Sequence, residues 1–384
     1  MKNKIKALLA LPLLTSAAFT NAAETEFTYG GYIKLDALLT MTDDGTLGPQ
    51  NLARDFYIPS LTPIGGIDED TQFDFHGKQT RFFFGTDTKL DNGETISTKI
   101  EFDFLVTPGG NERISNSYVP RMRHAFIKYG NWLFGQTWTT FQDVGALPET
   151  VDFVGVTEGT TFGRQAMIRY TNGNFNIAIE NPETTITPFG GGGRIVADDN
   201  TVPDLAANYA FKMDGGNYVK VSALMRQLSY SNASSGGTID DSASSTGISV
   251  SGRFNFGKDN LKFMLTTGSG LGRYVGLNFV NGAVLDASGN LETLDSTSGF
   301  VAWHHPWGNG WRSNFTYSMI DVDDNVALTG TGISSSASTF RANLMYSPVP
   351  KLTFGVEYST TTRENAGGQE GDMSRLQFGA KYAF

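Results

Sequence analysis

Residues 95–106 alternate between apolar and polar side chains with a period of two. The stretch TISTKIEFDFLV places Ile100 and Phe102 in one row and Lys99 and Glu101 in the other. Successive side chains of a β-strand point to opposite faces, so this segment predicts a strand with one apolar and one ionic face. The same alternation recurs along most of the chain, whereas helical periodicity is almost absent. We therefore predict an all-β protein.

The connections between the alternating segments are of two kinds. Short turn signals rich in Gly, Asn, Asp and Pro occur at residues 90–94, 129–132, 171–175, 213–218, 256–261, 305–311 and 347–352. Longer polar segments occur near residues 40–72, 107–118, 139–163, 182–203, 229–245, 270–297, 321–338 and 362–372. Short and long connections alternate along the chain.

This regular alternation is typical of one architecture. Seven tight turns join fourteen strands, and one further strand at each end gives about 16. An even number of strands places both termini on the side of the short turns. Barrels of the bacterial outer membrane have short periplasmic turns and long external loops. The sequence therefore predicts a transmembrane antiparallel β-barrel with long external loops.

In such a barrel the apolar face of each strand meets lipid and the polar face lines the lumen. An Arg or Lys turned toward the middle of the bilayer would cost roughly 2–4 kcal/mol, so the charged rows must point inward. On this register the lumen receives, among others, Arg81, Lys99, Glu101, Asp103 and Arg169.

The N-terminal residues are typical of a secretory signal peptide. Lys2, Lys4 and Lys6 precede an apolar run that is too short to span a membrane, and small residues follow it. We assign residues 1–22 to the signal peptide and residues 23–384 to a single barrel domain. Without these three lysines the formal net charge changes from −10 to −13. An acidic protein of this kind is not expected to bind nucleic acid.

Composition and spacing give no support for a metal site or a cofactor. The chain has no cysteine, so disulfides and thiolate metal sites are excluded. His304 and His305 are adjacent and point to opposite faces of a strand, so the two side chains cannot ligate one metal. We expect no cofactor, no metal and no enzymatic activity.

The last strand, RLQFGAKYAF, ends the chain on an aromatic residue. It resembles the closing strand of bacterial outer-membrane proteins, whose terminal Phe is recognised by the barrel-assembly machinery. The alternative interpretation is an aromatic residue at the membrane interface. Both interpretations place the strand in the outer membrane, where lipid and lipopolysaccharide would be its partners.

A closer resemblance lies in the segment RMRHAFIKYGNWLFGQTWTTFQDVGALPETVDF at residues 121–153 and in RQAMIRYT at 164–171. Together with GGYIKLDALL near the N-terminus, these segments resemble the family of DcaP-like trimeric porins. The resemblance implies a homotrimer and uptake of dicarboxylic acids and similar organic anions. Members often carry a heptad-rich segment before the first strand, but only ETEFT precedes it here, so a coiled coil is not expected.

The third long connection, residues 139–163, is where general porins and this family fold a loop into the lumen. It would narrow the pore with the acidic residues Asp143, Glu149, Asp152 and Glu158. The resemblance implies that the facing wall offers Arg81, Lys99, Arg123 and Arg169. Such an arrangement orients dipolar solutes and selects ions, and guanidinium groups match carboxylates. The alternative is that these charges pair only with one another.

Two other functions stay open at this point. An outer-membrane barrel enzyme, such as a lipase or protease, would need a catalytic constellation near one rim, and the four histidines are poorly placed for one. A structural or adhesive barrel with a blocked lumen is the other alternative. The favoured hypothesis is a porin that passes small hydrophilic solutes and prefers organic anions such as dicarboxylates.

Overall fold

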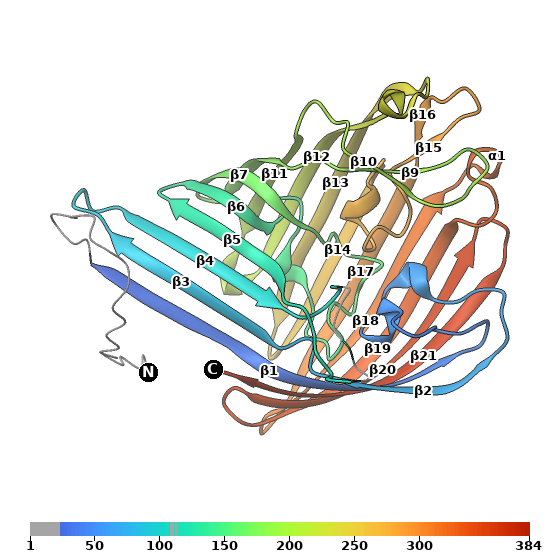
Figure 1. Cartoon of the computed structure of the whole chain (residues 1–384). Helices are drawn as coiled ribbons and strands as arrows, with labels where there is room; N and C mark the ends of the chain where they lie inside the picture. The colour runs from blue at the N-terminus through green and yellow to red at the C-terminus, as the bar shows by residue number, and fades with distance from the viewer. Residues whose placement is uncertain (1–23, 108–110, 112–113) are drawn as a thin grey trace.

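Most of the protein forms one closed antiparallel sheet (Figure 1). The computed structural model describes residues 24–107, 111 and 114–384, so the signal-peptide prediction lies outside the described residues. The strands of this sheet are β1 (Thr25–Thr42), β2 (Glu69–His76), β3 (Arg81–Lys89), β4 (Thr95–Asp103), β5 (Arg121–Tyr129), β6 (Trp132–Trp138), β7 (Arg164–Asn172), β8 (Phe175–Glu180), β11 (Asp204–Lys212), β12 (Tyr218–Ser231), β13 (Asp240–Phe256), β14 (Asp259–Ser269), β17 (Asp295–Gly308), β18 (Trp311–Asp323), β19 (Ser334–Val349), β20 (Leu352–Asn365) and β21 (Glu370–Ala383). Pairing of β1 with β21 closes the barrel.

The predicted number of strands is confirmed. The sheet of the described residues has 17 strands, but β2 and β3 both pair with β1. β2 pairs with the second part of β1, from Asp36 onward, and β3 pairs with the first part, up to Tyr32. β2 and β3 are therefore successive halves of one wall position, and the 17 strands fill 16 positions.

The predicted alternation of short and long connections is also confirmed. Each of the seven tight turns joins two consecutive strands of the barrel as a hairpin. Gly130 and Gly173 lie in the shortest of these hairpins with φ values of 54° and 60°. Hairpin turns of two residues require this left-handed conformation, which glycine adopts without steric cost.

The inward and outward faces follow the predicted alternation. On β4, 47% of the surface of Ile100 is exposed on the outside of the barrel, whereas Glu101 is 6% exposed. On β12 the outward Met225 is 58% exposed and the inward Arg226 is 6% exposed. The apolar belt faces outward and the charged rows face inward, as a membrane barrel requires. The fold-class prediction is confirmed.

A β-bulge in β5 decides the orientation of Arg123. On β5, His124 pairs with Glu101 and Met122 pairs with Phe102, so Arg123 is an extra residue in its strand. A bulge of this kind shifts the alternation by one position. Consequently Met122 is exposed on the outside, whereas Arg123 is buried and contacts inward-facing carboxylates of β4.

Three long connections fold into the barrel, although the sequence predicts only one. The predicted one, residues 139–163, is called the inner loop below. The first connection packs Ala53 and Tyr57 against the inward Met373 of β21. The connection that follows β14 packs Leu271 and Tyr274 inside the wall. Short 3-10 helices occur in these three connections at Leu52–Arg54, Pro59–Leu61, Val144–Ala146 and Gly272–Tyr274.

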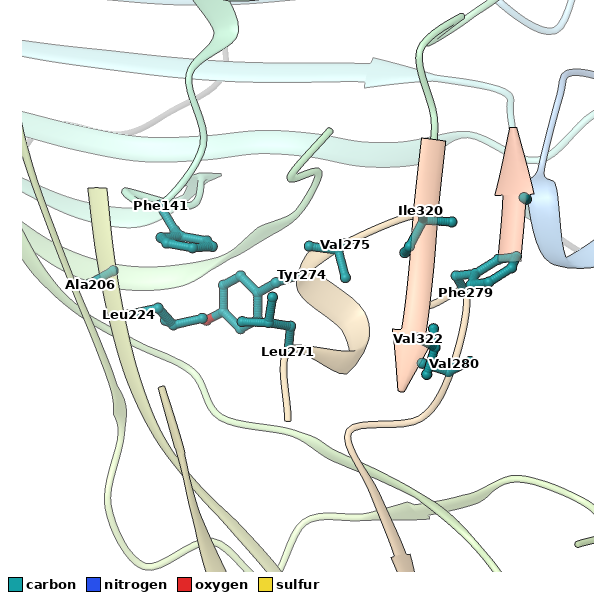
Figure 2. Packing of buried hydrophobic residues seen from close by; sticks show 11 residues of the cluster. Phe141, Ala206, Leu224, Leu271, Tyr274, Val275, Phe279, Val280, Ile320 and Val322 are labelled. Atoms are coloured by element: carbon teal, nitrogen blue, oxygen red, sulfur yellow. The ribbon is translucent and has the colours of Figure 1, made fainter. Parts of the chain in front are cut away.

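An apolar core inside the barrel joins two of these loops to the wall (Figure 2). Phe141 of the inner loop lies edge-on to the ring of Tyr274, with 6.0 Å between the ring centroids. Leu224 of β12 and Ile320 of β18 face the same core, and each is 1% exposed. These side chains lie on inward-facing positions, so part of the lumen is filled with protein.

A second, smaller sheet forms from two of the long connections. It contains β9 (Thr184–Thr187), β10 (Ile195–Ala197), β15 (Ala283–Leu285) and β16 (Leu291–Thr293). Its buried residues, including Ile186 and Ala283, pack against Leu228 of β12. Remaining short helical segments lie at Asp214–Gly216, Ala233–Ser235 and α1 (Val326–Thr329). Among the described residues, no helix is long and apolar enough to cross a membrane.

Two segments that the sequence predicts to be long loops are mostly strand. β12 and β13 pair out to Ser231 and Asp240, and β20 and β21 pair out to Glu364 and Glu370. The residues of these extensions are rich in Ser, Thr and Asp. Because both faces of such a hairpin are polar, there is no alternation of hydrophobicity from which a strand can be predicted.

Candidate functional site

Four basic side chains surround two carboxylates on the inner face of β3, β4 and β5. We call this set the basic cluster: Arg81, Lys99, Arg121 and Arg123 around Glu101 and Asp103. The sequence predicts all of these residues except Arg121 as site residues. Four positive and two negative charges leave a net charge of +2 on the basic cluster at neutral pH.

The contacts within the basic cluster differ in length. Arg123 donates to Glu101 and to Asp103, and both distances are 2.8 Å. Arg121 binds Asp103 through two hydrogen bonds of 2.9 and 2.8 Å. Arg81 is farther from the same carboxylates, with shortest distances of 3.6 and 3.7 Å. Of the four basic residues, Arg81 is therefore the one whose charge is least neutralised by the two carboxylates.

Arg164, the first residue of β7, adds a further positive charge beside the basic cluster. Its guanidinium lies 4.1 Å from the ring centroid of Trp138, and the guanidinium of Arg123 lies 5.7 Å from the same centroid. Its Nε and Nη2 atoms are buried without a hydrogen-bond partner among the described residues. No sequence signal singles out Arg164, because alternation along β7 places it in line with the outward Ala166 and Ile168.

Two acidic residues of the inner loop pair with basic residues of the wall. Asp143 accepts a 2.8 Å hydrogen bond from Lys220 and further bonds from Tyr218 and Ser251. Glu149 accepts two hydrogen bonds from Arg312, both of 2.6 Å. Charge-assisted bonds of this kind hold the loop along the strands from β12 to β18.

The other two acidic residues of the inner loop are buried and hold backbone or hydroxyl groups. Asp152 accepts from the backbone N–H groups of Tyr57, Val154 and Gly155. Glu158 accepts from the hydroxyls of Tyr57, Ser318 and Thr339. Burial raises the pKa of Glu158 above its ordinary value. The sequence gives no sign of Tyr57, Ser318 and Thr339 as partners, because each lies 95 or more residues away along the chain.

The structure places Arg169 apart from the basic cluster. It lies on β7 and donates to the hydroxyl of Thr140 at 2.8 Å and to the carbonyl of Trp138. These contacts are made at the start of the inner loop. Arg169 therefore supports the start of the inner loop.

A cavity of about 300 Å³ lies between the inner loop and the wall. Its basic lining residues are Lys34 of β1, Arg81 of β3 and Lys381 of β21, and Glu149 and Phe153 line it from the loop. Phe153 also contacts the basic cluster, since its ring centroid lies 5.5 Å from the guanidinium of Arg123. The cavity and the basic cluster therefore form one continuous site.

The contact between Glu149 and Arg312 predicts that the inner loop responds to acid. Burial raises the pKa of Glu149, but the hydrogen bonds and charge of Arg312 outweigh this and leave it below its ordinary value. A lowered pKa means that the stabilising contact is present above about pH 4.3 and is lost as pH falls through the folded-state pKa. We expect current fluctuations to increase in acid for the native protein, and Glu149→Gln to show them already at pH 7. Single-channel recording measures this.

Glu292→Gln is the matched control for this experiment, because Glu292 is an exposed acid on β16 outside the inner loop. It should behave as the native protein at both pH values. Equal pH dependence in the Glu149→Gln variant and the native protein would show that this contact does not steady the loop.

The guanidinium and ammonium groups of the basic cluster carry only hydrogen-bond donors and no acceptor. In the part of the chain that the structure describes, no three His, Asp or Glu side chains are grouped so that they could hold a metal ion. His305 contacts Asp259 at 2.8 Å and packs on Trp307, with 4.2 Å between the ring centroids. His124 hydrogen-bonds the hydroxyl of Thr137 at 3.0 Å.

Comparison with known proteins identifies the relatives of this chain. The model of the DcaP outer membrane protein family matches residues 85–384. The outer membrane channel DcaP of Acinetobacter baumannii has a similar structure, with a TM-score of 0.77 and 22% identity over 96% of this chain and 100% of that chain. No curated protein matches the sequence.

Two porin-like structures share the fold at lower similarity. OmpT of Vibrio cholerae has a TM-score of 0.54 and 12% identity over 95% of this chain and 99% of its own, and one of its structures is a trimer form. OmpF of Salmonella typhi, in complex with daunomycin, has a TM-score of 0.54 and 14% identity over 94% of this chain and 98% of its own. At these identities the likeness is one of fold.

Proposed function

This chain belongs to the DcaP outer membrane protein family, and from that premise we propose that it lets small organic anions, with dicarboxylates preferred, diffuse through its barrel. The family and the barrel fold place the protein in the outer membrane as a channel protein. The preference for anions is the part that rests on this chain's own residues. We propose no chemical step.

The observation that carries the proposal is the excess of positive charge beside the cavity. The basic cluster has a net charge of +2, and the adjoining cavity is lined by Lys34, Arg81 and Lys381 against the two acids Glu149 and Asp152. Basic rings in a pore favour anions, because the pore wall excludes part of the water that would otherwise screen them. Cations are repelled by the same positive potential.

Two carboxylates fit this arrangement better than one. Guanidinium groups bind carboxylates through two parallel hydrogen bonds, which Arg81 and Arg164 have free donors to provide. Lys381 also lines the cavity and offers a second positive group, whereas Lys34 is already paired with Asp36 at 2.9 Å. A short diacid can therefore be attracted at both ends. A monocarboxylate of the same length would meet only one of these groups.

Reversal potentials across planar bilayers test the proposal. We expect an anion preference in a gradient of potassium chloride, and a larger one in a gradient of disodium glutarate. A gradient of 1,5-diaminopentane hydrochloride is the matched comparison, because the organic ion has five carbons and the opposite charge. Equal permeability of the two organic ions would contradict the anion preference. If the purified protein produces no current in the bilayer, the porin function is contradicted.

A barrel with a blocked lumen is the second candidate, and one observation favours it. Three long connections fold inside the wall, and they share apolar cores with inward-facing residues such as Leu224 and Ile320. The absence of single-channel currents in the experiment above would support this candidate. Steady currents would exclude it.

We further propose that the protein assembles as a homotrimer within the lipid and lipopolysaccharide of the outer membrane. The support is the trimer form of the structurally similar OmpT of Vibrio cholerae. The exposed apolar belt, which includes Ile100 and Met225, is the surface that would meet lipid and neighbouring barrels.

A further inference from the structure

A second cavity, of about 530 Å³, lies beside the first part of the inner loop. The turn between β11 and β12 forms part of its lining, so it opens toward the short-turn side of the barrel, which faces the periplasm in an outer-membrane porin. Asp143 and Gly145 line it from the inner loop. The two cavities share no lining residue, so this one is separate from the site described above.

Three basic side chains line this second cavity: Lys212 of β11, Lys220 of β12 and Arg253 of β13. Asp143 is its one acidic lining residue. The carboxylate of Asp143 already accepts hydrogen bonds from Lys220, Tyr218 and Ser251. The negative charge of Asp143 is therefore neutralised by Lys220.

Lys212 and Arg253 have no carboxylate within ion-pair distance among the described residues. Arg253 donates from Nη2 to the carbonyl of Gly216 at 2.9 Å, and its Nε is buried without a hydrogen-bond partner. A buried donor without a partner is costly unless a ligand or water satisfies it. The second cavity thus contains two positive charges that the protein itself does not neutralise.

The remaining lining completes a site for a small organic anion. Asn217 adds an amide group, and Ala210 and Met213 provide apolar surface at the other side. A carboxylate can bind Arg253 and Lys212 while a short hydrocarbon chain contacts Met213. The volume is ample for a diacid of about five carbons, because ligand pockets are typically 300–1,000 Å³.

We propose that this second cavity is an anion-binding site at the periplasmic mouth, in which Lys212 and Arg253 bind the carboxylate of a permeating organic acid. The inference rests on the proposed anion pathway, because it gives that pathway a second binding position below the inner loop. Solutes that leave the basic cluster reach another positively charged site before they enter the periplasm.

Conductance in disodium glutarate tests the second site. We compare the native protein with the double variant Lys212→Gln/Arg253→Gln at low glutarate concentration. A cleft of one charge sign concentrates counter-ions tenfold or more, so removal of two charges should lower glutarate conductance by about threefold. Lys258→Gln is the control, since it removes an exposed charge from the turn between β13 and β14 without touching the cavity. Equal conductance in the double variant and the control would overturn the proposal.

A binding measurement separates this proposal from the proposed function. Crystals of the native protein soaked in 2-bromoglutarate should show anomalous bromine density in the second cavity, and crystals of the double variant should not. Native crystals without this density would also overturn the proposal. If the native protein shows no preference for chloride over potassium, the proposed function is contradicted. Bromine density beside Arg253 would still establish the second site.

Discussion

Replacing Glu357 by alanine will release the inner loop and destabilise the barrel. The Glu357 carboxylate accepts hydrogen bonds from the backbone N–H groups of Val151 and Asp152 at 2.9 and 3.0 Å. It also pairs with Arg341 at 2.7 Å, and both side chains are 1% exposed. Removal of one partner from a buried ion pair costs about 3–5 kcal/mol. We expect lower thermal stability and a higher single-channel conductance.

A second variant separates release of the loop from loss of stability. In Glu357→Leu/Arg341→Met, an apolar pair replaces the buried ion pair, a change that is often neutral or stabilising. The acceptors for the two N–H groups of the inner loop are nevertheless gone. We expect stability near that of the native barrel together with raised conductance. Native conductance in this variant would show that Glu357 does not hold the loop.

Replacing Arg81 and Arg164 together by glutamine will remove most of the anion preference. Neither guanidinium is the main partner of a carboxylate in the described residues, so the change removes charge without exposing a buried acid. Two unit charges about 8 Å apart at an effective dielectric constant of about 20 interact by about 2 kcal/mol. Allowing for screening by salt, we expect the chloride-to-potassium permeability ratio to fall about fivefold. Reversal potentials in a potassium chloride gradient measure this ratio.

Lys351→Gln is the matched control for the charge change, because Lys351 is exposed in the turn between β19 and β20, away from the site. It should leave the permeability ratio unchanged. If the double variant Arg81→Gln/Arg164→Gln keeps the native ratio, the basic cluster does not set the selectivity, and the second cavity or the loop charges must do so.

The local pattern of apolar and polar residues was sufficient to predict the barrel wall. The rows of Ile100 and Phe102 against Lys99 and Glu101 predicted which side of β4 faces lipid, and the hairpin residues predicted all seven short turns. These features depend only on neighbours in sequence, since a strand alternates with period two and a tight turn spans a few residues. The prediction became ambiguous at Arg123, where the β-bulge shifts the alternation.

The contents of the lumen could be predicted only in part. An inward third loop is expected from the family resemblance, whereas the inward loops around Tyr57 and Tyr274 are not. Figure 2 shows Tyr274 in its cluster. A signal was present in hindsight at β18, where the inward Ile320 and Val322 are apolar and the outward Asp321 and Asp323 are polar. Such an inversion marks a place where the inside of the barrel is packed with protein rather than filled with water.

The sequence by itself determined the number of strands, the face that most strands turn to lipid, and the concentration of charged residues inside the barrel, because each follows from residues close together in the chain. Only the tertiary structure decided which charges are neutralised. Asp143 meets Lys220, Glu149 meets Arg312 and Glu158 meets Tyr57, whereas Arg164 and Arg253 keep unpartnered donors. Ion pairing depends on distances of a few ångströms between residues far apart in the chain, and only closure of the barrel sets those distances.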